Sequence, residues 1–267
     1  MRLTGIIFDW AGTTVDHGSR APAATLQEVF EEAGLVITAE EARQSMGIAK
    51  RAHIAAILAL PRVSAEWECR YGVKPSDAEI DRLYECFVPK QLACLERYSD
   101  VIAGVPRAVE QLRARGLKIG STTGYTRPML DLLLEMAAKQ GFAPDCAVCP
   151  EDAPGGGRPA PWMCYLNVVR MAVGPMWTMI KIGDTPSDIG EGLNAGMWTI
   201  GVTRTGNEVG MTMAEWDTAA PAERSAALAV AERRLRDAGA HYIAEGVCDC
   251  GSIIDEIEAR VDAGERP

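Results

Sequence analysis

The spacing of hydrophobic residues changes along the chain and predicts two kinds of structure. Short apolar runs, each long enough for one strand, occupy residues 6–8, 117–121, 146–149, 179–182 and 199–202. The later runs alternate with segments of helical spacing, which is typical of a parallel sheet covered on both faces. The pattern therefore predicts an α/β fold, with a doubly wound, Rossmann-like parallel sheet as its core.

Between residues 22 and 98 the apolar residues recur at helical spacing, with almost no strand-like run. We expect a core domain made of residues 1–20 and 100–267, with an α-helical cap domain, residues 21–99, inserted after the first strand. The tail beyond residue 213 predicts two helices around a short segment at residues 241–243, without a recognisable group of catalytic residues. Residues suited to starting helices in the cap are Thr38 and Ser76.

The composition and net charge of the chain argue against some classes of function. The chain has 267 residues, 48% of them hydrophobic, and a formal net charge of -10. That charge argues against a nucleic-acid or anionic-membrane partner, because both need a basic surface. No signal-peptide-like segment or run of 18 apolar residues is present, so we expect a cytoplasmic protein whose eight cysteines are reduced, mostly buried thiols.

Candidate chemistry gathers after the predicted strands. Asp9 ends the first apolar run and precedes a small turn, beginning near Gly12, whose N–H groups can face an anion. Thr123, Arg158 and Asp184 follow later strands. Because ligands collect outside the carboxyl ends of parallel strands, these side chains should meet at one edge of the sheet, where two carboxylates suit Mg²⁺. Taken singly, each has a simpler explanation, as a strand-end residue, a solvated loop cation or a helix N-cap.

Four ordered segments resemble the motifs of the haloacid dehalogenase superfamily: Asp9-Trp10-Ala11-Gly12-Thr13-Thr14, Ser121-Thr122-Thr123-Gly124, Arg158 and Gly183-Asp184-Thr185-x-x-Asp188. The resemblance covers essentially the whole chain. It implies an aspartyl-phosphate intermediate and three sets of residues: a nucleophile, Asp9; phosphate-binding residues, Gly12, Thr123 and Arg158; and Mg²⁺ ligands, Asp9, Asp184 and the carbonyl of Ala11, supported by Asp188.

One departure from that pattern is informative. Phosphatases of the superfamily carry a second aspartate two positions after the nucleophile, which protonates the leaving oxygen; here the position is Ala11, which has no proton to donate. This alanine, together with a lysine-bearing cap segment at residues 46–53, resembles the phosphonatase family, whose members cleave carbon–phosphorus bonds. Other matching stretches are residues 120–127, 158–165 and 194–199. The resemblance implies hydrolysis of phosphonoacetaldehyde to acetaldehyde and phosphate, in the degradation of 2-aminoethylphosphonate.

A lysine can replace the missing acid, because an imine between Lys50 and the aldehyde accepts the electrons that leave phosphorus. Lys50 must then be neutral, which requires burial or a nearby positive charge such as Arg51 or the metal. If one helix carried Met46, Lys50 and His53, their spacing would put them on one face, and His53 could move protons during imine formation. Met46 and Tyr125 are expected to help form the substrate and phosphate site, although packing in its loop would explain Tyr125 equally well.

Cap movement and association are the remaining expectations. Hinges near residues 17–22 and 98–104 would let the cap open and close over the substrate. The family resemblance also implies a homodimer formed through the caps. Apolar residues that could supply that surface, or could equally form the cap's own core, are Leu58, Leu60, Trp67 and Tyr71.

Two other functions remain open. A magnesium-dependent phosphomonoester phosphatase would share the fold and the nucleophile, and Ala11 argues against it. A catalytically silent binding or scaffold protein is a second class, and the joint presence of Asp9, Thr123, Arg158 and Asp184 argues against that one.

Overall fold

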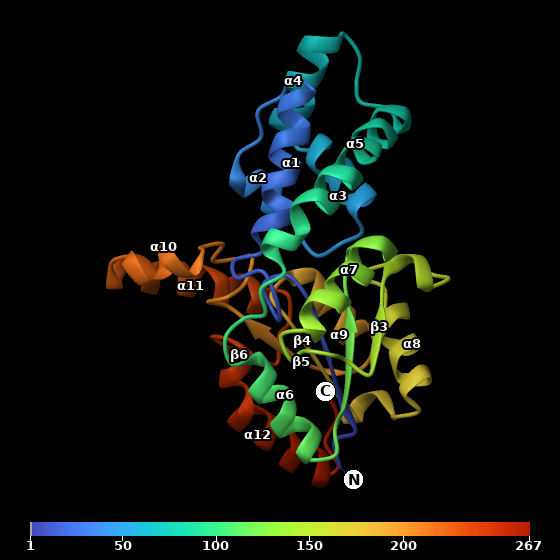
Figure 1. Ribbon diagram of the computed structural model, residues 1–267, viewed down its shortest axis with the longest axis vertical. Coiled ribbons are helices and arrows are strands. Elements are labelled where there is room, and N and C mark those ends of the chain that lie inside the picture. Colours follow the sequence, from blue (N-terminus) through green and yellow to red (C-terminus); the bar gives the residue numbers. More distant parts are fainter. Residues whose placement is uncertain (1) are drawn as a thin grey trace.

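The computed structural model describes residues 2–267, in which a sheet flanked by helices forms the lower part and a group of helices stands above it (Figure 1). Within these residues six parallel strands follow the order β3-β2-β1-β4-β5-β6. In chain order they are β1 (Gly5–Phe8), β2 (Lys118–Thr122), β3 (Cys146–Val148), β4 (Met179–Gly183), β5 (Trp198–Val202) and β6 (Tyr242–Ala244). This is the order of a doubly wound, Rossmann-like sheet, so the predicted fold class is confirmed.

The tail differs from its prediction. Its short segment is strand β6, which pairs in parallel with β5 and extends the sheet at one edge. Three residues are too few for a hydrophobic period to be visible in the sequence. The tail also carries three helices rather than two: α10 (Met213–Thr218), α11 (Pro221–Asp237) and α12 (Gly251–Asp262), with a 3₁₀ turn, η4 (Val247–Asp249), before the last.

Helices cover both faces of the sheet. In β1, Ile6 and Phe8 belong to one large apolar cluster shared with α6 (Val105–Ala114), α7 (Arg127–Ala138) and α12, whereas Ile7 belongs to a second cluster shared with α8 (Trp162–Met171). The strands are therefore buried on both sides, which explains their nearly continuous apolar runs. The core also contains α9 (Pro186–Asn194) and the 3₁₀ turns η2 (Pro150–Asp152) and η3 (Met176–Thr178).

The helical segment after β1, which we call the cap, stands beyond the carboxyl ends of the strands (Figure 1). Thr38 and Ser76 both cap helices, as predicted, and each closes a capping box with the glutamate three residues later. The proposed domain boundaries stay a prediction. The cap helices are α1 (Arg20–Glu32), α2 (Ala39–Arg43), α3 (Lys50–Leu58), α4 (Pro61–Tyr71) and α5 (Asp77–Leu95), followed by η1 (Glu96–Tyr98).

Two of the residues considered for a dimer surface lie inside the cap. Leu58 and Trp67 are buried within the single chain and belong to its main apolar cluster. Tyr71 is 43% exposed and packs against Trp67, with ring centroids 4.5 Å apart. Leu58 and Trp67 therefore form the cap's own core, and the homodimer stays a prediction.

The cysteines are free thiols that are less buried than predicted. All eight cysteines are free, but only Cys149, Cys164 and Cys250 are buried, so the expectation of mostly buried thiols is wrong. Within residues 2–267, no helix combines the length and the apolar character needed to cross a membrane.

Candidate active site

The first site residue, Asp9, lies where the strand order of the sheet reverses. Its N–H donates to the carbonyl of Ile182 in the adjacent strand β4, at 2.9 Å. Asp184 directly follows the end of β4, so the two carboxylates sit at neighbouring strand ends. A crevice at such a switch point is the usual ligand site of doubly wound sheets. The fold thus brings these two aspartates together at one edge of the sheet, as predicted.

Asp188, on α9, joins Asp9 and Asp184 in a buried cluster, in which one carboxylate oxygen from each residue lies within 4.8 Å of the other two. Thr13 donates its hydroxyl to Asp184 Oδ1 at 2.9 Å, and the Asn207 N–H donates to Oδ2 at 2.7 Å. Burial, together with the neighbouring carboxylates, holds the pKa of Asp184 well above its usual range. Burial also raises the pKa of Asp9, although Arg158 opposes it.

Two buried cations lie beneath the cluster. The Arg158 guanidinium reaches Asp9 Oδ1 at 2.6 Å and Glu191 Oε2 at 2.9 Å. The Lys181 ammonium lies 2.9 Å from Asp188 Oδ1 and 3.2 Å from Glu191 Oε2. Burial favours the neutral acid at Asp188, but Arg158 and Lys181 outweigh it and lower the pKa of that carboxyl. The two cations therefore keep part of the cluster ionised.

Sequence reasoning missed Lys181 and Glu191. A lysine in the middle of an apolar strand that is buried on both faces is itself a signal, since such a charge needs a buried partner. Glu191 gave no comparable signal, because a glutamate on an amphipathic helix is ordinarily solvated. Only the packing of α9 against β4 turns it inward.

The charges at the site fit a divalent cation. Two buried cations, Arg158 and Lys181, face four buried carboxylates: those of Asp9, Asp184, Asp188 and Glu191. If all four were ionised, they would outnumber these two cations and the nearby Lys50 ammonium, a cost that raises the pKa values of Asp9 and Asp184 and that a bound cation would offset. Oxygen ligands of this kind suit Mg²⁺, and the Ala11 carbonyl beside Asp9 could add another.

Lys181→Met should lower the free energy of unfolding by about 3–5 kcal/mol, because it leaves buried carboxylates without their partner. Urea unfolding measures the change. The control is Lys139→Met, which removes an exposed pair with Glu135 on α7 and should cost less than about 0.5 kcal/mol. Equal, small losses in both variants would show that Lys181 is not needed to balance the buried charge.

The structure corrects the role of Gly12. Its N–H donates to the carbonyls of Val15 and Asp16, at 2.8 and 3.1 Å, so in this conformation it is not free for a phosphate. Its φ of +85° favours glycine, and a Cβ there would lie 2.3 Å from Asp184 Oδ2. Gly12 therefore serves the close approach of the first turn to Asp184, rather than the anion contact that was expected.

Lys50 comes from the cap and enters the same site. It is 5% exposed and helps to line a small cavity with Asp9, Thr123 and Tyr125. Its Nζ lies 4.9 Å from the centre of the Tyr125 ring, whose hydroxyl is buried without a hydrogen-bond partner among the residues that the structure describes. Thr123 Oγ1 accepts a hydrogen bond from the Tyr125 N–H at 3.2 Å. The lysine, the nucleophile candidate and the phosphate-binding candidate thus share one space.

Burial lowers the pKa of Lys50 to about 8, with Arg158 adding to the effect and Asp9 opposing it. The expected contribution of Arg51 is wrong. That side chain points into solvent and pairs with Asp77 and Asp81, at 3.0 and 2.6 Å. The positive neighbour that Lys50 feels belongs to the core, not to its own helix.

The single helix expected across residues 46–53 is also wrong. Helix α3 begins at Lys50, and Met46 precedes it in a turn. The break is Gly47, whose φ is +91° and whose Cβ position would lie 2.4 Å from Thr185 Oγ1. Met46 nevertheless lines the cavity with Lys50, because the turn folds the two toward the same space.

His53 lies one turn beyond Lys50 on α3 and is fully buried. Neither ring nitrogen has a hydrogen-bond partner of normal geometry. Burial, with the charge of Lys50, lowers the pKa of His53 to about 3. The imidazole is therefore neutral, and the part of it in proton transfer stays a prediction.

The site has clustered aspartates at the point where the strand order reverses, and a helical cap follows the first strand. These features are typical of the class of haloacid dehalogenase-like hydrolases, and the model of that family matches residues 3–196. The chain is 43% identical over 265 residues to the phosphonoacetaldehyde hydrolase of Nitratidesulfovibrio vulgaris, covering 99% of this chain and 94% of that one. It is 46% identical over 258 residues to that of Bacillus cereus, covering 97% of both. The chain therefore belongs to the phosphonoacetaldehyde hydrolase family within that class, as its motifs indicated.

A solved structure agrees with this placement. The phosphonoacetaldehyde hydrolase-like protein of Oleispira antarctica superposes with a TM-score of 0.97 at 37% identity, over 100% of this chain and 96% of that one. The agreement extends over the cap as well as the core, since the whole chain is covered. The fold described above is thus the fold of that relative.

Proposed function

We propose that the protein hydrolyses the carbon–phosphorus bond of phosphonoacetaldehyde, releasing acetaldehyde and phosphate, in 2-aminoethylphosphonate degradation. The observation that carries the proposal is the buried Lys50 amine, which shares one cavity with the Asp9 carboxylate. Ala11 occupies the position at which a phosphatase needs a proton donor for the leaving oxygen. The site is therefore suited to a leaving group that is bonded to phosphorus through carbon. The names of the relatives support the same substrate.

The first part of the proposed mechanism belongs to Lys50. Its neutral amine adds to the aldehyde carbon and, with loss of water, forms a protonated imine. The positive nitrogen lies two bonds from the carbon that carries phosphorus. When the carbon–phosphorus bond breaks, its electron pair therefore moves into an enamine rather than remaining on carbon as a free carbanion.

The second part belongs to Asp9. One carboxylate oxygen forms a bond to phosphorus as the enamine leaves, giving an aspartyl phosphate. Arg158 and Thr123 hold the phosphoryl oxygens, a role supported by the position of the guanidinium 2.6 Å from Asp9. Water then releases phosphate and restores Asp9, while protonation and hydrolysis of the enamine release acetaldehyde and restore Lys50.

Asp9, Asp184 and the carbonyl of Ala11 would hold Mg²⁺, with Asp188 supporting them. A bound Mg²⁺ would keep the Asp9 carboxylate ionised and offset the charge of the phosphoryl group. This assignment is supported by the excess negative charge of the cluster and by the spacing of its oxygens.

Substrate entry requires the cap to move. The cavity around Lys50 has a volume of about 20 Å³, room for little more than one water molecule. The conformation described is therefore a closed one. Opening about the segments at residues 17–22 and 98–104 would admit the substrate, and closure would exclude water from the imine.

The test is to incubate the protein with phosphonoacetaldehyde and Mg²⁺ and to measure both products. We expect acetaldehyde and phosphate in equal amounts, and loss of turnover on chelation that added Mg²⁺ restores. Simple phosphate esters are assayed in parallel. Turnover of the esters without release of acetaldehyde would contradict the proposal and favour the phosphatase alternative.

The pKa of Lys50 sets a pH dependence. Below its pKa of about 8 the amine is protonated and cannot form the imine, so kcat/KM should rise with pH and level off above that value. Each unit below the pKa should reduce kcat/KM about tenfold. The measurement is kcat/KM at constant ionic strength, with the stability of the protein checked at each pH. A flat profile between about pH 6 and pH 9 would exclude a lysine of this pKa as the group that controls turnover.

A further inference from the structure

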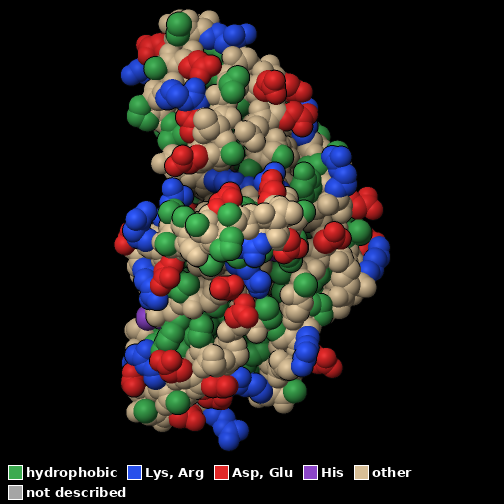
Figure 2. All heavy atoms as spheres, turned by 90° about the vertical axis from the view of Figure 1, so that its left-hand side faces the viewer, with side chains coloured by type: hydrophobic (Ala, Val, Ile, Leu, Met, Phe, Trp, Pro, Cys, Tyr) green, Lys and Arg blue, Asp and Glu red, His purple; other side chains and the backbone are tan. Residues whose placement is uncertain are grey.

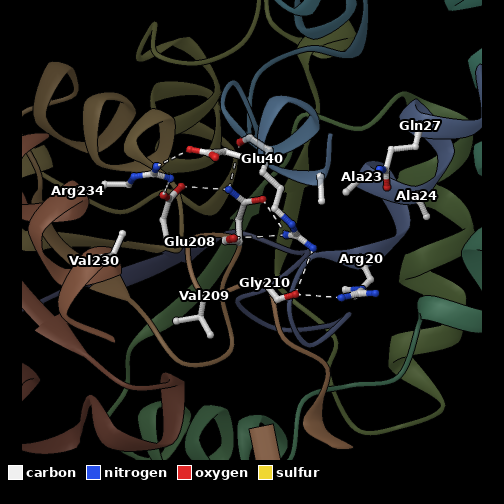
Figure 3. Close-up of a pocket in the computed structure, with 13 residues that line it drawn as sticks. Arg20, Ala23, Ala24, Gln27, Glu40, Glu208, Val209, Gly210, Val230 and Arg234 are labelled. Atoms are coloured by element: carbon white, nitrogen blue, oxygen red, sulfur yellow. Dashed lines mark hydrogen bonds and ion pairs between the residues drawn. The ribbon is translucent and has the colours of Figure 1, made fainter. Parts of the chain in front are cut away.

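A second, larger cavity lies at the base of the cap, away from Lys50. Its volume is about 390 Å³, and it is bounded by α1 and α2 of the cap, by α11 and by the loop after β5. Acidic and basic side chains meet on this side of the molecule at the junction of the cap and the core (Figure 2). In Figure 3, Arg20 approaches Gly210 from one side of the cavity, while Glu208 and Arg234 pair on the other.

Arg43, the last residue of α2, is the lining residue that connects the most parts of the structure. Its NH1 donates to the carbonyls of Gly18 and Ser19 in the hinge, at 2.8 and 3.4 Å. The same group donates to Asn207 Oδ1 at 3.1 Å, and NH2 donates to the Gly210 carbonyl at 3.3 Å. One guanidinium therefore joins a cap helix, the hinge and a core loop.

The side chain of Asn207 also donates a hydrogen bond to Arg43. Its Nδ2 donates to the Arg43 carbonyl at 3.2 Å, so the two residues are held in both directions. Asn207 is buried, and its backbone N–H is the group that donates to Asp184 Oδ2 at 2.7 Å. A path of two residues thus leads from the end of α2 to a carboxylate of the acidic cluster.

The neighbouring glycines show how closely this loop is fitted. A Cβ on Gly206 would lie 2.5 Å from the Asp184 Cβ. A Cβ on Gly210, whose φ is +67°, would lie 2.9 Å from the Arg43 guanidinium carbon. The loop is therefore in close contact with the acidic cluster at one end and with the cap at the other.

We infer that Arg43 is a positioning residue that couples the docked cap to the metal site: with the cap in place it holds Asn207, and Asn207 orients Asp184. The inference rests on the proposed function for the assignment of Mg²⁺ to this cluster. Cap closure would then do two things at once, bringing Lys50 into the cavity and setting the geometry of a metal ligand on the opposite side of the hinge.

Arg20 provides a matched comparison. It also donates to the Gly210 carbonyl, at 3.1 Å, and pairs with Glu215 at 3.3 Å, but its contacts do not include Asn207. If mere packing of an arginine beside the cavity mattered, both residues would have similar effects. If the path through Asn207 matters, only Arg43 should affect the metal.

The experiment measures Mg²⁺ binding by calorimetry, with MgCl₂ alone as the probe and without substrate. We expect Arg43→Gln and Asn207→Ala each to raise the Kd for Mg²⁺ about tenfold, the lower end of the range for residues that support a metal ligand. Arg20→Gln should change it less than about twofold. Because Arg43 and Asn207 act in series, the double variant should be no worse than the weaker-binding single variant. Thermal unfolding verifies that each variant is folded.

An unchanged Kd in Arg43→Gln, or single effects that multiply in the double variant, would overturn the inference. If Arg43→Gln does not fold, Arg43→Lys decides by the same criteria, since it keeps the charge but not the forked donors. The acetaldehyde assay on the parent protein reports separately on the proposed function. A parent that releases acetaldehyde but whose variants bind Mg²⁺ equally well would refute the coupling alone.

Discussion

Lys50→Arg should abolish acetaldehyde release, lowering kcat/KM for phosphonoacetaldehyde by about 10⁴-fold or more, the scale on which loss of a covalent catalytic group acts. A guanidinium stays protonated at all accessible pH values and cannot form the imine. Without the imine, the carbon–phosphorus bond has no electron sink, and Ala11 offers no acid in its place. Acetaldehyde release and borohydride trapping of the imine, detected by mass spectrometry, measure the effect.

The matched control is Lys90→Arg, the same change on cap helix α5 at a lysine that pairs with Glu28 and Glu32. It should leave turnover and trapping near the parent values, because those pairs are surface contacts. In the parent, borohydride with substrate should attach a two-carbon or phosphonate-bearing group to Lys50 and inactivate the protein. Undiminished release of acetaldehyde by Lys50→Arg would sink the imine mechanism.

Asp9→Asn should lower turnover on a similar scale, about 10⁴-fold or more, while leaving imine formation intact. The amide has nearly the shape of the carboxylate, and its oxygen can still accept from Arg158, so the fold should persist. It is, however, a poor nucleophile toward phosphorus. The variant should therefore still be labelled at Lys50 when borohydride is added with substrate, although neither product is released.

Labelling of Lys50 without product release would separate imine formation at Lys50 from phosphoryl transfer to Asp9. The control, Asp131→Asn, neutralises an exposed aspartate on α7 that pairs with Arg127, and it should change neither trapping nor turnover. Loss of labelling in Asp9→Asn would mean that Asp9 takes part in imine formation or that the variant fails to close. Thermal unfolding and Mg²⁺ titration of the same sample distinguish those two explanations.

The core could be predicted because its signals are local. Each buried strand is a short apolar run, and the residue after it is visible in the sequence, as Asp9 and Asp184 are. The general rule that parallel strands present their carboxyl ends together then brings such residues to one edge. The capped helix starts at Thr38 and Ser76 are local in the same sense.

The predictions that were wrong concern residues whose roles depend on how the folded chain packs around them. Gly12 lost its expected phosphate contact because its amide is used by its own turn and its missing side chain makes room for Asp184. Met46 left the expected helix because Gly47 must approach Thr185 of the core. Arg51, adjacent to Lys50, faces solvent instead of the site.

The sequence alone thus determined the fold class and the nucleophile candidate, since both depend on residue types at short spacings. Lys50 was singled out by the resemblance to the phosphonatase family, because by itself it would be taken for a solvated helix lysine. Only the tertiary structure decided how those groups are charged and held. The low pKa of Lys50 comes from burial by the core and from Arg158, more than a hundred residues away. Glu191 and Arg43 act through partners more distant in the chain, Arg158 and Asn207, because burial and Coulomb interactions depend on separation in space and not on order in sequence.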